Sequence, residues 1–127
     1  MPKTLYLSTV MLNHTLRATP FTPPPAIYVA LYTTAPTVAL PGIEVAGGAY
    51  SRQPATFAAP VAGSVTNTAD VVFPTATAQW GTIVAYALLD APTGGNMLYF
   101  ADFAAPRFID VNDDAHFPTS QLLIQEV

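Results

Sequence analysis

The chain has 127 residues, of which 51% are hydrophobic and only 9% are charged, and it contains no cysteine. This length suits one domain, and the lack of cysteine excludes disulfides, thiolate metal sites and a thiol nucleophile. A net charge of −4 leaves no basic stripe for nucleic-acid phosphates, so nucleic-acid binding is not expected. No apolar run approaches the roughly 20 residues of a membrane helix, so membrane insertion is not expected either.

The start of the chain predicts one amphipathic helix over about residues 4–18, followed by a proline-rich arm over residues 19–25. The apolar residues at helical spacing are Leu5, Leu12 and Leu16, with Leu7 and Met11 alongside. Thr4 is a suitable N-cap, and Pro20 prevents the helix from continuing. The prolines that follow keep the arm extended, so it leads stiffly into a sheet.

Residues 26–127 predict short strands joined by turns, because thirteen prolines and seven glycines exclude further long helices. Strands are expected at residues 26–33, 49–57, 63–67, 70–73, 82–89, 97–103, 107–111 and 120–126. Pro54 indicates an edge strand or a bulge, and the turn residues APTGGN predict a hairpin between the fifth and sixth strands. The sequence therefore predicts a single domain with a mainly β fold, an antiparallel β-sandwich of jelly-roll or related type with one N-terminal α-helix.

Gly47 and Gly48, within GIEVAGGAYSRQPATF, have the look of a loop that holds phosphate. Such a loop needs a lysine and a hydroxyl directly after its last glycine and then a helix, whereas Ala49 and Tyr50 follow here and a strand pattern resumes. The dinucleotide fingerprint also lacks its third glycine. We interpret the pair as a turn between strands, with positive φ angles, and Arg52 as either a surface residue or an interface anchor.

Asp110, Asn112 and Asp114 occupy the first, third and fifth positions of a calcium-loop pattern. The pattern then fails, because Ala115 replaces the glycine of the sharp turn and Gln121 replaces the bidentate glutamate. A solvated turn before the last strand is the better interpretation.

No catalytic, metal-binding or cofactor-binding residue is expected. The only histidines, His14 and His116, are not accompanied by a nucleophile motif such as G-x-S-x-G, and scattered carboxylates meet by chance in any fold. Most aromatic residues fall in strand segments, where core packing is the default.

Five blocks of the sequence follow the order of a known family. They are LNH (12–14), YVALYT (28–33), EVAGGAYSRQ (44–53), FPTATAQWG (73–81) and DAPTGGNML (90–98). Together they resemble small tailed-bacteriophage structural proteins, often labelled tail-fibre or minor structural proteins, over roughly residues 5–103. The end of the chain follows the family pattern loosely, since residues 112–117 replace its usual G-D-x-x-x-F turn. The resemblance implies a virion location and no catalytic residues.

We therefore expect a non-enzymatic virion protein whose neutral surface is covered by other phage structural proteins and by copies of itself. A capsid decoration (cement) role and a neck or tail role stay open, with residues 34–48 as a second contact loop. The alternative is a carbohydrate- or host-receptor-binding module of a tail fibre, in which an exposed Trp80 or tyrosines stack on sugar rings. The candidate interface residues are Pro23, Pro24, Pro25, Tyr50, Arg52 and Trp80.

Overall fold

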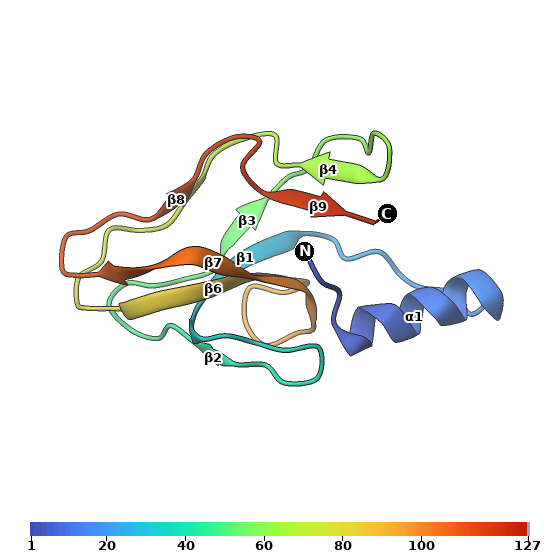
Figure 1. Cartoon of the computed structure of the whole chain (residues 1–127), viewed down its shortest axis with the longest axis horizontal. Coiled ribbons are helices and arrows are strands. Elements are labelled where there is room, and N and C mark those ends of the chain that lie inside the picture. Colours follow the sequence, from blue (N-terminus) through green and yellow to red (C-terminus); the bar gives the residue numbers. More distant parts are fainter. Residues whose placement is uncertain (127) are drawn as a thin grey trace.

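The computed structural model describes residues 1–126, which form one N-terminal helix and short antiparallel strands (Figure 1). The elements are α1 (Leu5–Leu16), β1 (Ile27–Thr34), β2 (Ile43–Glu44), β3 (Gln53–Ala55), β4 (Ser64–Thr66), β5 (Val71–Val72), β6 (Gly81–Leu89), β7 (Met97–Ile109), β8 (His116–Phe117) and β9 (Leu123–Gln125). The predicted mainly β class with one helix is confirmed. In this part of the chain the strands form three antiparallel sheets, and no closed sandwich or jelly roll is shown.

The main sheet has the order β2-β1-β6-β7, and β3 also pairs with β1. The strands β2 and β3 share one edge of β1, where Glu44 of β2 lies opposite Tyr32 and Pro54 of β3 lies opposite Tyr28. Pro54 thus stands on an edge strand, one of the two positions predicted for it, because a proline has no N–H to donate to a second neighbouring strand. The short β2 falls within the segment expected to be a loop, so that expectation was wrong for residues 43–44.

The predicted hairpin of β6 and β7 is confirmed, but the two strands expected at 97–103 and 107–111 are one continuous strand. Ile83 pairs with Arg107 and Ala85 pairs with Asp102, so residues 103–106 of β7 stand opposite Val84 alone. The expected break therefore coincides with a large bulge, residues 103–106 against one residue of β6, at which Pro106 has no N–H to donate to the ladder.

Two short ribbons, β4–β9 and β5–β8, accompany the main sheet (Figure 1). Side chains from both ribbons and from the main sheet share one core, which includes Val29, Leu31, Val71, Phe73, Trp80, Ile83, Leu122 and Ile124. A second, smaller cluster joins β1, β6 and β7 through Ala30, Tyr32, Ala85, Ala87, Leu89 and Phe100. The strand β8 was not predicted, because its two residues carry no strand pattern of their own.

The helix α1 begins where predicted, at a Thr4 cap whose hydroxyl oxygen accepts from the Leu7 N–H at 3.3 Å. Thr4 also ties the helix to β7, since its N–H donates to the Leu98 carbonyl at 3.0 Å. Only Leu7 of the helix is buried, and α1 extends away from the sheets (Figure 1).

The predicted apolar face of α1 is exposed, with Leu5, Leu12 and Leu16 retaining 55%, 58% and 77% of their surface. The helix is apolar on both sides, so packing through Leu7 turns the other leucines outward. No helix within residues 1–126 combines the length and apolarity needed to cross a membrane.

Candidate functional site

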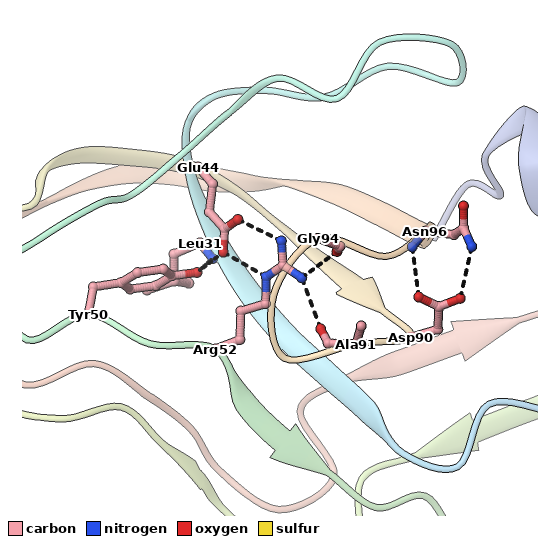
Figure 2. Close-up of polar contacts among 8 residues, drawn as sticks. All are labelled: Leu31, Glu44, Tyr50, Arg52, Asp90, Ala91, Gly94 and Asn96. Atoms are coloured by element: carbon pink, nitrogen blue, oxygen red, sulfur yellow. Dashed lines mark hydrogen bonds and ion pairs between the residues drawn. The ribbon is translucent and has the colours of Figure 1, made fainter.

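The edge of β1 has a gap between its two partner strands, and Tyr50 fills it (Figure 2). The N–H of Leu31 donates to the Tyr50 hydroxyl oxygen at 3.0 Å, while the Leu31 carbonyl accepts from the Val45 N–H at 3.0 Å. A side-chain hydroxyl thus replaces a strand partner and satisfies a backbone donor that would otherwise be unpaired.

Glu44 and Arg52 form a two-point ion pair beside this hydroxyl, and we call Glu44, Tyr50 and Arg52 the edge cluster. The Arg52 Nε donates to Glu44 Oε2 at 2.9 Å and its Nη2 donates to Oε1 at 2.8 Å. The Tyr50 hydroxyl donates to the same Oε2 at 2.6 Å. Planar two-point pairing of this kind fixes both side chains in direction as well as in distance.

Arg52 also anchors the loop between β6 and β7, which lies far from it in the sequence (Figure 2). Its Nη1 donates to the carbonyls of Ala91 at 2.9 Å and Gly94 at 2.8 Å. The loop is closed on itself as well, because Asp90 accepts from the Asn96 N–H at 2.7 Å. The blocks EVAGGAYSRQ and DAPTGGNML therefore meet in one structural unit.

The charges of the edge cluster stabilise one another. Burial raises the pKa of Glu44, but the hydrogen bonds from Arg52 and Tyr50 outweigh it and bring that pKa below its ordinary value. The hydrogen bond with Glu44 raises the pKa of Arg52, and burial together with the Glu44 charge raises the pKa of Tyr32 to about 12. Glu44 and Arg52 are therefore charged and paired at neutral pH, while burial raises the pKa of Tyr50 and keeps its hydroxyl protonated as a donor, which suits a structural brace.

This pairing changes the interpretation of two predicted interface residues. The Arg52 side chain is only 9% exposed and its donors are occupied by the chain itself. Tyr50 is half-buried, with its ring against Trp80 at a centroid distance of 5.5 Å. Both residues hold the fold together, and a role in partner contact stays a prediction.

Trp80 is 5% exposed, so the expectation of an exposed tryptophan that stacks on sugar rings was wrong. Its Nε1 donates to the Gly48 carbonyl at 2.8 Å and its ring packs against Phe73. The glycine pair is the predicted turn, with φ angles of +77° at Gly47 and +59° at Gly48. The close approach of the indole explains why the second position must be a glycine, since a Cβ there would lie 2.9 Å from the Trp80 ring.

The acidic segment at 110–114 is also a turn, and its carboxylates bond to the chain. Asp113 accepts from the Asp110 N–H at 2.8 Å, and Asp114 accepts from the Thr75 hydroxyl at 2.6 Å. His14 lies on α1 and His116 on β8, and within residues 1–126 no three metal-ligating side chains gather.

The model of one protein family, described as podophage GP4 fiber I protein gp80, matches residues 2–125. The chain belongs to this family. The match confirms the resemblance seen in the five sequence blocks and extends it through the loosely fitting end of the chain. A comparison with curated proteins gave no match.

The family places this fibre protein in the virion as a structural component, which agrees with a non-enzymatic role. The capsid decoration role expected as one possibility gains no support from the family. Contact with other phage structural proteins follows as a general expectation for a fibre component.

The fibre protein exposes apolar side chains where the start of α1 meets the loop that follows β1. We define the contact surface as Leu5, Tyr6, Val38 and Leu40, which together border a hollow of about 250 Å³. The N–H of Leu5 donates to the Val38 carbonyl at 2.9 Å, so helix and loop are joined directly. Leu40 retains 65% of its surface and Val38 retains 48%.

The predicted proline arm is extended and lies between α1 and β1, with Pro23 and Pro25 exposed and Pro24 half-buried. The sequence pointed to this arm and to the loop at 34–48, but it did not single out the leucines of α1 as surface residues. Their helical spacing suggested a packed face instead.

Proposed function

We propose that this fibre protein is a non-enzymatic building block that binds a second copy of itself through the contact surface. The observation that supports the proposal is the exposed apolar area at Leu5, Val38 and Leu40, on a chain with few charged residues. Contiguous exposed apolar surface of this kind marks interaction sites on soluble proteins.

A second copy is the partner that this surface suits best. None of its four residues carries a charge, so two such surfaces can meet without an unpaired buried charge. In a two-fold dimer the same patch on both subunits forms the interface, which requires a self-complementary surface. Leu12 and Leu16 extend the apolar surface along α1.

The free energy gained by burying the contact surface is too small to hold two subunits firmly, so further contacts are needed. Full burial of one large apolar side chain contributes roughly 1.5–3 kcal/mol, so covering the exposed half of several such residues gives about 1 kcal/mol each. Association itself costs an estimated 4–15 kcal/mol, so the contact surface alone holds two subunits weakly. The arm at 19–25 is the natural addition, because its prolines lose little conformational entropy on docking.

Sedimentation velocity of the purified chain tests this proposal. We expect a reversible oligomer that Leu40→Asp converts to monomer, because the new carboxylate would be buried without a partner. Val61→Asp is the matched control, since Val61 is 76% exposed and lies outside the contact surface. A wild-type chain that stays monomeric at high concentration, or equal association of both variants, would refute it.

The competing role is capsid decoration. Quantitative mass spectrometry of purified virions separates the two, because a fibre subunit is present in far fewer copies than the major capsid protein. A copy number close to that of the major capsid protein would favour decoration instead.

A further inference from the structure

A cavity of about 410 Å³ opens between the β6–β7 hairpin and the segment that carries β8. The bulge of β7 creates it, because residues 103–106 leave the regular ladder opposite Val84 and widen the space beside β6. Bulges often re-aim side chains next to functional sites, and this volume falls within the roughly 300–1,000 Å³ of small-molecule pockets.

Three aromatic rings line the cavity. Tyr86 of β6 lies 4.9 Å from Phe103 of the bulge and 5.1 Å from Phe117 of β8, measured between ring centroids. Phe103 and Phe117 stack with an interplanar angle of 15° at 5.9 Å. All three residues are half-buried, so the cluster keeps aromatic surface in contact with solvent.

The rim of the cavity carries Asp102, Arg107, His116 and Gln121, all of them exposed. Their side chains form no hydrogen bond or ion pair with any part of the chain that the structure describes, and neither does the Tyr86 hydroxyl. They bring both hydrogen-bond donors and acceptors to one opening.

In the part of the chain that the structure describes, Arg107 differs from the other lysine and arginine side chains. Lys3 pairs with Glu126 at 2.8 Å, Arg52 pairs with Glu44 at 2.8 Å, and Arg17 donates to Asn13 at 3.3 Å. Within residues 1–126, Arg107 is thus the cation whose donors are left for an external molecule.

We propose that this cavity binds a saccharide, with the aromatic rings against the C–H face of a pyranose ring and the rim side chains on its hydroxyls. A sugar combines an apolar face with many hydroxyls that both donate and accept, and the cavity offers the matching combination of surfaces. This inference goes beyond the proposed role in subunit contact.

The charges at the rim select among ligand classes. The negative charge of Asp102 balances the positive charge of Arg107, so the rim carries no excess of positive charge for a phosphate-rich ligand. Glycoside hydrolysis commonly needs a pair of carboxyl groups, whereas Asp102 is the one carboxylate among the lining residues. The site therefore binds its saccharide without cleaving it.

The test begins with a glycan array probed with the intact chain, followed by calorimetric titration of the strongest oligosaccharide hit. We expect Arg107→Ala to weaken binding at least about tenfold, the loss of one charge-assisted hydrogen bond. Arg17→Ala is the matched control, because Arg17 is an exposed arginine at the C-cap of α1, away from the cavity, and this variant should bind as the wild type does.

Phe103→Leu provides a second variant, since it keeps apolar volume in the bulge but removes the aromatic face. It should also weaken binding, with thermal unfolding measured to show that the fold persists. Silence of the wild-type chain across the array would overturn the proposal, and so would equal affinities of all four proteins.

The two proposals fail independently. Arg107→Ala should keep the sedimentation behaviour of the wild type, and Leu40→Asp should keep its saccharide affinity. Loss of saccharide binding in Leu40→Asp with the fold intact would place the site elsewhere and refute the assignment to this cavity.

Discussion

Replacing Tyr50 by Phe removes one oxygen atom from the edge cluster and leaves the ring in place. That oxygen accepts from the Leu31 N–H at 3.0 Å and donates to Glu44 at 2.6 Å. The substitution therefore leaves one backbone donor without a partner and one carboxylate with fewer donors, while the packing of the ring against Trp80 persists.

The expected cost follows from these two bonds. An unpaired buried donor costs about 1–3 kcal/mol, and a hydrogen bond to a charged group is worth roughly 1.5–3 kcal/mol. The two losses overlap at a half-buried site that water can reach, so we expect a total of about 2–4 kcal/mol. For a chain of this size each kcal/mol lowers Tm by roughly 3–5 °C, which gives a drop on the order of 10 °C.

Urea unfolding followed by the fluorescence of Trp80, the single tryptophan, measures this loss. Tyr28→Phe is the matched control, because Tyr28 is a half-buried tyrosine of β1 whose hydroxyl forms no hydrogen bond within residues 1–126. It should change the free energy of unfolding by less than about 1 kcal/mol. Equal effects of the two substitutions would refute the view that the Tyr50 hydroxyl completes the edge of β1.

Three further predictions concern pH, backbone conformation and calcium. The pKa of Glu44 is lower in the folded chain than its ordinary value of 4.5. The ionised Glu44 carboxylate therefore stabilises the fold above pH 4.5, and this stabilisation is lost as the pH falls through the folded pKa. The free energy of unfolding of Glu44→Gln should accordingly depend less on pH in acid than that of the wild type. Gly48→Ala should destabilise the chain by about 2 kcal/mol or more, because the new Cβ would lie 2.9 Å from the Trp80 ring at a positive φ. Gly47→Ala also has a positive φ but meets open space, so it should cost only about 1 kcal/mol. Equal melting temperatures of the two variants would contradict this prediction. Calcium should leave Tm unchanged, since the acidic turn at 110–114 lacks the glutamate ligand of a calcium loop; a clear rise in Tm would show binding to the folded state.

The strands β1 and β6 of the main sheet, and the hairpin that follows β6, were predictable because their signals are local. Alternating branched and aromatic residues define β1 and β6, and the turn residues at 91–96 define the hairpin. The strands β2 and β8 were missed because each is two residues long and exists only through backbone pairing with a partner distant in sequence. The bulge of β7 was interpreted as a break, because Pro106 interrupts the strand pattern in the same way whether the strand bulges or ends.

The edge cluster shows what the sequence cannot provide. Tyr50 and Arg52 were singled out as candidates, yet their burial depends on Glu44 and on a loop about forty positions further along the chain. Core packing was the default expectation for Trp80, and the carbohydrate-binding alternative placed it at the surface, because a strand pattern does not say which face is covered. The saccharide cavity combines residues of β6, β7 and β8, and no local motif links them.

The central claim is that the apolar surface at the start of α1 and at the loop after β1 is covered by another subunit in the particle. Hydrogen–deuterium exchange of the isolated chain, diluted until sedimentation velocity shows a monomer, and of purified virions measures this directly. We predict slower exchange in virions at residues 5–16 and 37–41, and equal exchange at residues 60–63 around the exposed Val61. Identical exchange of the helix and loop in both samples would contradict the account.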